Sequence, residues 1–141
     1  MTNEVRLRVR YAETDQMGIA YHSNYLIWFE VGRVEFMRQV GFDYKHVEKQ
    51  DQCFMAVADA RCRYKAAARY DDEIIVRTHV KNVRGPLVHF GYEILRAEDR
   101  ALLAEGETMH IVTDAEFRRK SLPEKYARAM RNAVSDGHIT R

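Results

Sequence analysis

Alternation of apolar and polar residues marks out the strands of this chain. Val5–Tyr11 places apolar side chains on one face and arginines on the other, which is the period of a half-buried strand. In the second half, the turn Arg84-Gly85-Pro86 separates two more alternating segments. Successive short turns join the last three strands, so the sequence predicts an antiparallel meander. The strands predicted there are Cys53–Tyr64, which is less regular, Glu73–Val83, Leu87–Ala97 and Leu102–Thr113.

A long helix is predicted between the first two strands, from the candidate N-cap Ser23 to about Val40, with Gly41 ending it. Its first half is apolar almost all the way round, whereas a surface helix shows only an apolar stripe. We therefore expect a curved sheet to wrap this helix, with close backbone approach at Gly32. Two shorter helices are predicted, over Tyr44–Lys49 and from Glu124, just after Pro123, to about Val134.

Together these elements predict an α+β fold in which a curved antiparallel sheet surrounds a long central helix. At 141 residues the chain is expected to form a single domain over residues 1–134, and the polar residues 135–141 are expected to fray. One sheet of this kind leaves edges and an outer face uncovered. A second subunit is therefore expected to pack against it.

Composition places the chain among globular proteins, with 46% apolar and 31% charged residues. The net charge of +2 is too small to predict binding to nucleic acid or to an anionic membrane. No apolar run reaches the roughly 20 residues of a membrane helix, and the first residues lack the pattern of a signal peptide. Cys53 and Cys62 are too few for a disulfide framework and are expected to be buried thiols in a reducing compartment. We therefore expect a cytoplasmic protein.

The residues with the clearest chemistry come just before the long helix. Tyr11, Asp15 and His22 bring a phenol, a carboxylate and an imidazole toward the helix N-terminus, where backbone N–H groups are free and the dipole is positive. The N–H groups of the first turn, around His22 and Ser23, are candidate donors to an oxyanion. Asp15 can attack a carbonyl carbon or direct water at it. This arrangement predicts hydrolysis of an acyl derivative.

A dense set of residues carries a further signal: Tyr11, Thr14-Asp15, Gly18, Tyr21-His22, Tyr25-Leu26, Phe29-Glu30 and Arg33. In these residues the chain resembles the hotdog-fold acyl-CoA thioesterases, in the 4-hydroxybenzoyl-CoA thioesterase group and its Tol-Pal-associated branch. The resemblance implies a hotdog fold and Asp15 as the catalytic carboxylate, either nucleophile or general base, accompanied by Tyr11 and His22. It also implies an acyl-CoA substrate, no metal or other cofactor, and a homodimer or homotetramer with active sites at subunit interfaces.

Each of the three candidate catalytic residues has a structural alternative. Asp15 can be a cap or turn residue, His22 a histidine bonded to backbone, and Tyr11 a core tyrosine at the end of a strand. The other histidines, His46, His79, His89, His110 and His138, show no metal-ligand spacing, so no metal site is expected.

Three residues are candidate contacts for the substrate. Tyr25 lies on the aromatic face of the helix, where it can meet an aliphatic or an aryl group. Arg84 and Arg119 can form forked hydrogen bonds with the phosphates of coenzyme A, or they can simply be solvated. Two other functions stay open: a hotdog hydratase, and a non-catalytic module that binds acyl-CoA or acyl-carrier protein. A carboxylate beside the ligand's carbonyl favours the hydrolase over the binding module.

Overall fold

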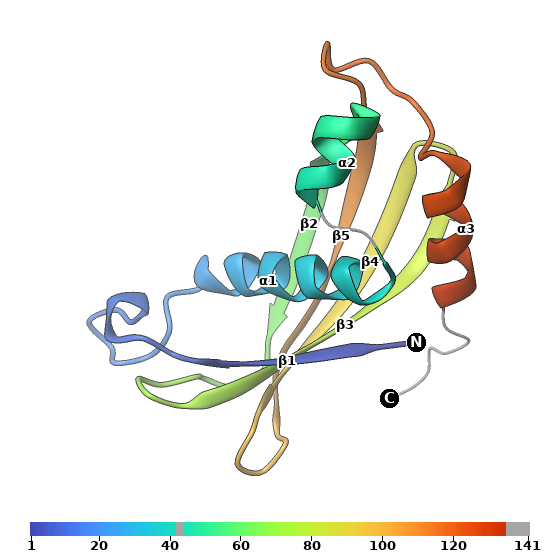
Figure 1. Cartoon of the computed structure of the whole chain (residues 1–141). Helices are drawn as coiled ribbons and strands as arrows, with labels where there is room; N and C mark the ends of the chain where they lie inside the picture. Colours follow the sequence, from blue (N-terminus) through green and yellow to red (C-terminus); the bar gives the residue numbers. More distant parts are fainter. Residues whose placement is uncertain (42–43, 135–141) are drawn as a thin grey trace.

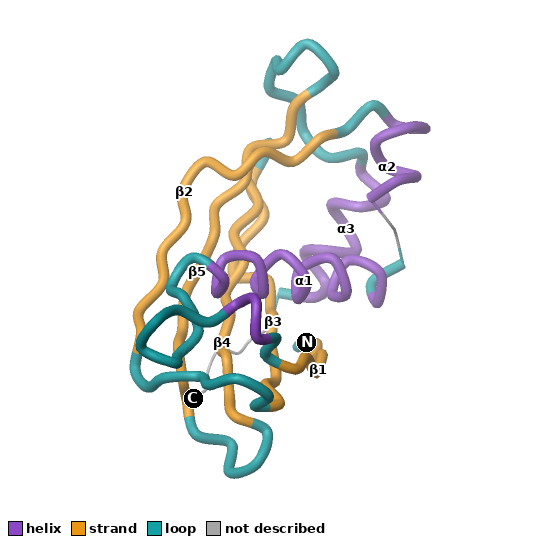
Figure 2. The backbone as a smooth tube through the Cα atoms, turned by 90° about the vertical axis from the view of Figure 1, so that its left-hand side faces the viewer, coloured by secondary structure: helices purple, strands orange, loops and turns teal. Residues whose placement is uncertain are grey.

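The computed structural model describes residues 1–41 and 44–134. Five antiparallel strands form one sheet in the order β1-β3-β4-β5-β2, and α1, α2 and α3 lie on one side of it (Figure 1, Figure 2). The predicted α+β fold is confirmed, and the predicted tail 135–141 lies outside the described residues. The strands are β1 (Asn3–Arg8), β2 (Phe54–Tyr64), β3 (Glu73–Arg84), β4 (Leu87–Arg96) and β5 (Leu102–Thr113). The helices are η1 (Tyr11–Glu13, a 3-10 helix), α1 (Asn24–Gln39), α2 (Tyr44–Asp51) and α3 (Glu124–Ala133).

The predicted meander is present at the centre of the sheet. β3, β4 and β5 pair in succession, with Val76 opposite Ile94 and Ile94 opposite Ala104. β2 pairs with the other side of β5, and its register shifts between Val57 and Asp59, as its irregular pattern predicted. β1 pairs with β3. The two edges of the sheet are therefore β1 and β2.

α1 crosses the sheet and packs aromatic side chains onto it. The Phe29 ring stacks on the Tyr92 ring with 4.3 Å between centroids, and both side chains are fully buried. A Cβ added at Gly32 would lie 2.6 Å from Val76 Cγ1, which is closer than real Cβ atoms approach. The close approach predicted at Gly32 is confirmed, and it lets α1 lie directly against β3.

The first strand is shorter than predicted. β1 ends at Arg8, which is the last residue paired with β3, opposite Glu73. The chain then turns, because the Glu13 carboxylate accepts a hydrogen bond from the Arg10 N–H at 2.8 Å and closes η1. Tyr11 begins η1 and is 77% exposed, so the alternative of a core tyrosine at the end of a strand is wrong.

α1 is covered less completely than its apolar sequence predicted. Leu26 and Ile27 are 40% and 51% exposed, because the sheet covers only one side of the helix. Ser23 occupies the N-cap position, but its side chain makes no capping hydrogen bond. α1 ends at Gln39, and Gly41 follows with a φ of 108°, a value that glycine tolerates. In the single chain, apolar surface is thus left open at the start of α1.

Candidate active site

The residues between β1 and α1 fold into one compact loop that carries the candidate chemistry. The Asp15 N–H donates to the Ile19 carbonyl at 2.9 Å, and the Gly18 N–H donates to the Asp15 carbonyl at 2.9 Å. An isolated bridge joins Thr14 to Ala20. Gly18 has a φ of 79°, which glycine adopts without steric cost. We refer to residues 11–23 as the site loop.

The Asp15 carboxylate has one oxygen engaged. Its Oδ1 accepts a hydrogen bond from the Met17 N–H at 2.8 Å, as in an Asx turn. Within residues 1–41 and 44–134, Oδ2 has no hydrogen-bond partner, and the residue is partly exposed. The turn role and the predicted catalytic role are therefore compatible, because one oxygen orients the carboxylate and the other is available.

Two backbone N–H groups at the start of α1 are also available. The Tyr21 carbonyl accepts from the Asn24 N–H at 3.0 Å, and the His22 carbonyl accepts from the Tyr25 N–H at 3.3 Å. The N–H groups of His22 and Ser23, by contrast, donate to no other described residue. N–H groups in this position, at the positive end of a helix, suit a developing oxyanion.

Asp15, His22 and Tyr11 share the site loop, but among the described residues no hydrogen bond joins any of them to another. The exposed His22 ring packs against Tyr21 at 4.4 Å between centroids. The Tyr11 ring instead contacts Tyr70 edge-on at 5.6 Å. A relay in which each group bonds to the next is therefore not formed in the described chain. The groups can act on a substrate placed between them.

Sequence reasoning does not find Glu13, which holds the site loop onto α1. Its buried carboxylate accepts hydrogen bonds from the Arg10 N–H, the Arg10 guanidinium and Trp28 Nε1, at 2.8, 3.2 and 3.3 Å. Burial raises the pKa of Glu13, but these donors outweigh it and lower the pKa below the usual value. The available signals are the capping-box spacing from Arg10 to Glu13 and a tryptophan N–H that needs a partner when buried.

A strap of residues 66–72, which follows β2, backs the site loop. The Ala20 N–H donates to the Ala68 carbonyl at 2.8 Å. An isolated bridge joins Ile19 to Arg69 one step further along. The arm of the loop that leads into His22 is therefore held by backbone contacts with the strap.

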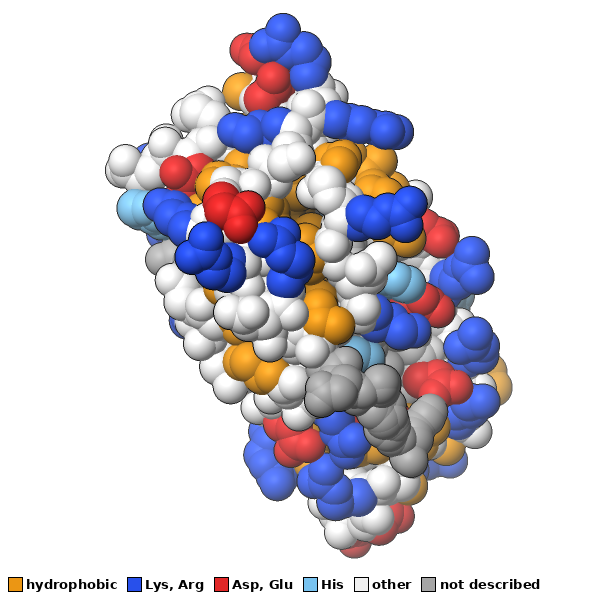
Figure 3. Space-filling view, turned by 90° about the vertical axis from the view of Figure 1, so that its right-hand side faces the viewer, with side chains coloured by type: hydrophobic (Ala, Val, Ile, Leu, Met, Phe, Trp, Pro, Cys, Tyr) orange, Lys and Arg blue, Asp and Glu red, His pale blue; other side chains and the backbone are white. Residues whose placement is uncertain are grey.

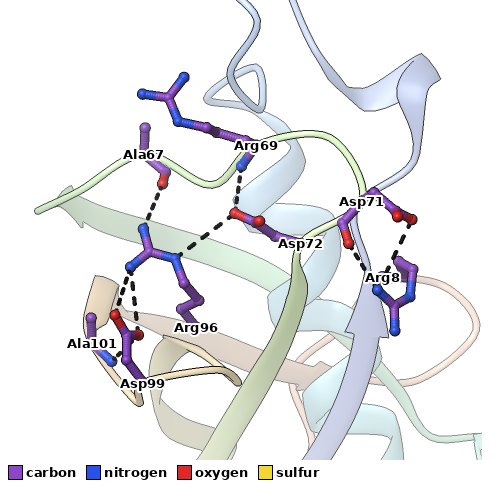
Figure 4. A network of polar contacts seen from close by, with 8 residues as sticks. All are labelled: Arg8, Ala67, Arg69, Asp71, Asp72, Arg96, Asp99 and Ala101. Carbon is purple, nitrogen blue, oxygen red and sulfur yellow. Dashed lines mark hydrogen bonds and ion pairs between the residues drawn. The ribbon is translucent and has the colours of Figure 1, made fainter.

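Arg96, at the end of β4, holds the strap in turn (Figure 4). Its Nη2 donates to the Ala67 carbonyl at 3.3 Å, and its Nε lies 3.9 Å from the Asp72 carboxylate. Asp72 also accepts a hydrogen bond from the Arg69 N–H at 2.9 Å. Asp99 contacts the outer side of the guanidinium at 3.2 Å. The hairpin between β4 and β5 therefore supports the site loop through Arg96 and the strap.

Tyr25, the predicted acyl contact, lies inside the core. It is 3% exposed, and its ring meets the Trp28 ring at 4.7 Å and the Tyr64 ring at 5.0 Å, both edge-on. Burial raises the pKa of the Tyr25 hydroxyl. In the single chain Tyr25 therefore stands behind the site loop, and its contact with a substrate stays a prediction.

Arg84 and Arg119 are not brought to the site loop of their own chain. Arg84 ends β3 beside the turn to β4, and Arg119 follows β5 and bridges to Thr113. Figure 1 and Figure 2 place both segments toward the other end of the sheet from the site loop. Lys and Arg side chains are also spread over the face that includes α3, with acidic side chains between them (Figure 3).

Metal clusters, membrane-spanning helices and disulfides are absent from the described residues. Among residues 1–41 and 44–134, no group of three or more His, Cys, Asp or Glu side chains is arranged to hold a metal ion. None of the described helices has both the length and the apolar character to cross a membrane. Cys53 and Cys62 are both free thiols.

Several known proteins similar to this chain are named as thioesterases. Residues 9–130 match the thioesterase-like superfamily. The chain is 37% identical over 123 residues to the putative acyl-CoA thioesterase YneP of Bacillus subtilis, a match that covers 84% of this chain and 88% of that protein. It is 30% identical over 119 residues to the acyl-CoA thioester hydrolase YbgC of Escherichia coli O157:H7, with 84% and 87% covered. The DHNA-CoA thioesterase of Staphylococcus aureus superposes with a TM-score of 0.88 at 31% identity, covering 93% of this chain and 89% of that one.

The fold and the site loop together define a hotdog-fold thioesterase. The chain belongs to the thioesterase-like superfamily, as the match over residues 9–130 shows. The resemblance carried by the residues from Tyr11 to Arg33 is thereby confirmed. The roles of Tyr11, Asp15, His22 and Ser23 in this chain stay predictions.

Proposed function

We propose that this protein is an acyl-CoA thioesterase, which hydrolyses an acyl-CoA thioester to the free acid and coenzyme A. The observation that carries the proposal is the site loop. Its Asp15 carboxylate has an unengaged oxygen, and its His22 and Ser23 N–H groups are unengaged among the described residues. A thioester needs an oxygen nucleophile at its carbonyl carbon and donors at its carbonyl oxygen, and one loop offers both.

In this proposal Asp15 acts as general base or as nucleophile. As a base, it takes a proton from water while the water oxygen bonds to the thioester carbon. As a nucleophile, it forms an anhydride that water then opens. In both routes the carbonyl oxygen becomes negative beside the His22 and Ser23 N–H groups, the C–S bond breaks, and the coenzyme A thiolate takes up a proton. The His22 imidazole orients water or bonds the carbonyl, and Tyr11 lines the mouth of the site.

The proposed active unit is a homodimer, alone or within a tetramer, with the sites at its interface. β2 is an edge strand with one side unpaired, and long unpaired edges favour pairing with another chain. A second copy paired along β2 would cover apolar surface that the single chain leaves open. Most of the exposed large apolar side chains lie on the site loop, the strap, the start of α1 and β2: Tyr11, Met17, Tyr21, Leu26, Ile27, Val57, Tyr64 and Tyr70.

Pairing along β2 also gives Arg119 a role despite its distance from the site loop of its own chain. In a two-fold dimer, antiparallel pairing puts the start of β2 beside the end of the partner's β2. Tyr64, at the end of β2, contacts His22, whereas Phe54, at its start, lies opposite Thr113 of β5. The segment after β5, with Arg119, therefore comes near the partner's site loop, where it can meet the phosphates of coenzyme A.

Thiol release from short-chain, long-chain and aryl acyl-CoA thioesters tests the activity. We expect turnover by the wild type and a loss of about 100-fold or more in Asp15→Asn, because an amide neither takes the proton nor attacks the carbonyl carbon. Glu48→Gln is the control, because it also replaces a carboxylate by an amide but lies exposed on α2. Equal rates in wild type and Asp15→Asn would contradict the assigned mechanism.

Mixed subunits test whether the arginines act on the partner's site. Asp15→Asn and the double variant Arg84→Ala/Arg119→Ala are refolded together in equal amounts. Each mixed dimer then has one site with both an intact loop and intact arginines, so about a quarter of all sites should recover. Activity that stays at the mean of the two separate variants would contradict the contribution from the partner.

The proposal includes a cytoplasmic location and no cofactor besides the coenzyme A part of the substrate. Both cysteines are free thiols, which fits a reducing compartment. The alternative hydratase would release no thiol, so the assay with the ester panel separates the two reactions. Tight binding of the esters without turnover would favour the non-catalytic binding module.

A further inference from the structure

Tyr64 connects the edge strand β2 to the first turn of α1. Its hydroxyl donates a hydrogen bond to the His22 carbonyl at 3.0 Å, across 42 positions of sequence. Its ring meets the His22 ring edge-on at 6.4 Å and the Tyr25 ring edge-on at 5.0 Å. Tyr64 therefore contacts both the ring and the backbone of the residue that carries the site's imidazole.

The bonded His22 carbonyl belongs to the same peptide unit as the Ser23 N–H. A trans peptide is planar and its C=O and N–H point in opposite directions, so a held oxygen fixes the direction of the N–H. The Tyr25 N–H reaches this oxygen only at 3.3 Å, which is long for a hydrogen bond. The Tyr64 hydroxyl supplies the second and shorter contact. A hydrogen bond to the carbonyl also polarises the peptide and strengthens its N–H as a donor.

We propose that Tyr64 is a positioning residue for thioester hydrolysis: its hydroxyl fixes the His22–Ser23 peptide and its ring restrains the His22 imidazole, so that both face the thioester on which Asp15 acts. This inference rests on the proposed function for the identity of the reaction. The contact itself is formed without substrate, so it can be measured separately.

The surroundings of Tyr64 keep its hydroxyl a donor. Partial burial of the phenol, and after it the hydrogen bond with Cys62, raises the pKa of Tyr64 to about 12. The phenol therefore holds its proton at neutral and moderately alkaline pH, whereas a phenolate would repel the His22 carbonyl. Burial also raises the pKa of the Cys62 thiol, so the neighbour of the phenol stays neutral.

Tyr64→Phe removes the hydroxyl and keeps the ring. We expect kcat to fall about tenfold while KM changes by less than about twofold, because the substrate still binds but the donors lose their direction. Tyr126→Phe is the matched control: it also loses one tyrosine hydrogen bond, of 2.7 Å to Asp51, but lies on α3. An equal fall of kcat in Tyr126→Phe would overturn the inference.

Backbone NMR measures the contact without turnover. In Tyr64→Phe the His22 carbonyl and Ser23 N–H resonances should shift and the Tyr25 N–H should exchange faster with solvent, whereas Tyr126→Phe should leave all three unchanged. These measurements distinguish a failure of the proposed function from a failure of the role of Tyr64. A wild type that hydrolyses no ester defeats the proposed function before any variant is compared. An active wild type whose Ser23 resonance or kcat is unaffected by Tyr64→Phe overturns the role of Tyr64 alone.

Discussion

The indole Nε1 of Trp28 donates a hydrogen bond to the Glu13 carboxylate at 3.3 Å, so the central helix and the site loop share one buried carboxylate. Glu13 is only 6% exposed, and Arg10 supplies its other donors. Removing one member of a buried polar set leaves the others without partners, which costs more than the bond itself contributes. The loop that carries Asp15 is therefore held in place by a carboxylate that takes no part in the proposed chemistry.

Replacing Glu13 should destabilise the whole protein. Glu13→Ala leaves the Trp28 indole and the Arg10 N–H without an acceptor, so we expect the free energy of unfolding to fall by about 2–4 kcal/mol. Glu13→Gln keeps an acceptor and should cost about half as much. Urea denaturation measures both. The exposed Glu30 is the control, since Glu30→Ala should change stability by less than about 0.5 kcal/mol. Equal losses at both positions would contradict this role of Glu13.

Replacing Arg96 should loosen the site loop from a distance. Arg96→Met loses the hydrogen bond to the Ala67 carbonyl and the ion pair with Asp72, but keeps an apolar stem of similar length. We expect hydrogen exchange to quicken in a peptide covering residues 14–22, with a stability loss of about 1–2 kcal/mol. Arg100→Met, which loses an exposed contact with Glu4 at 3.1 Å, is the control. Lower stability with unchanged exchange in residues 14–22 would mean that Arg96 supports only the sheet.

Periodicity predicted the strands well where both faces of a strand have a fixed environment. The predicted segment Leu87–Ala97 differs from β4 by one residue, because its alternating apolar residues are all buried: Val88, Phe90, Tyr92 and Ile94. Alternation failed at Tyr11, where the pattern of β1 continues after its pairing has ended. β1 has no partner in β3 beyond Arg8, and a local pattern carries no information about where a distant strand begins.

Because sequence patterns are local, they also predicted only some of the residues of the site. Asp15 and His22 could be found because one short loop and one helix start carry them together. Tyr64 and Arg96 could not, because their contacts with the site loop and its strap span 42 and 29 positions and leave no period in the sequence. Arg119 could be proposed as a phosphate contact, but its distance from the site loop of its own chain follows only from the sheet order.

Filling the space at Gly32 should show how tightly α1 packs on the sheet. In Gly32→Ala the new methyl would collide with the Thr78 hydroxyl and with Val76 Cγ1, so we expect a loss of about 1–3 kcal/mol despite the better helix propensity of alanine. Val76→Ala removes one colliding group. The double variant should therefore lose less free energy of unfolding than the two single variants lose together. We expect the difference in this double-mutant cycle to be about 0.5 kcal/mol or more. If the two single losses simply add, the strain in Gly32→Ala does not arise from contact with Val76.

His110 lies in a buried polar chain beneath α1. Its Nε2 contacts the Thr108 hydroxyl at 2.8 Å, and that hydroxyl contacts the Tyr92 hydroxyl at 2.6 Å, to which Arg33 donates at 3.2 Å. Among the described residues, Nδ1 of His110 has no hydrogen-bond partner. Burial, and after it the positive charge of Arg33, lowers the pKa of His110 to about 3. The folded protein therefore holds this histidine neutral.

Acid should destabilise the protein through His110 well before the carboxylates titrate. Above about pH 6.5 neither the folded nor the unfolded chain binds a proton here, so this group contributes no pH dependence. Below that pH the unfolded chain binds a proton that the folded chain refuses, so stability falls until the pH approaches 3, by up to about 1.4 kcal/mol per unit. Between pH 6.5 and 4.5 the wild type should lose about 2–3 kcal/mol more than His110→Gln, whose amide does not titrate. Urea denaturation at the two pH values measures the difference, and parallel losses in both proteins would show that the folded state accepts the proton.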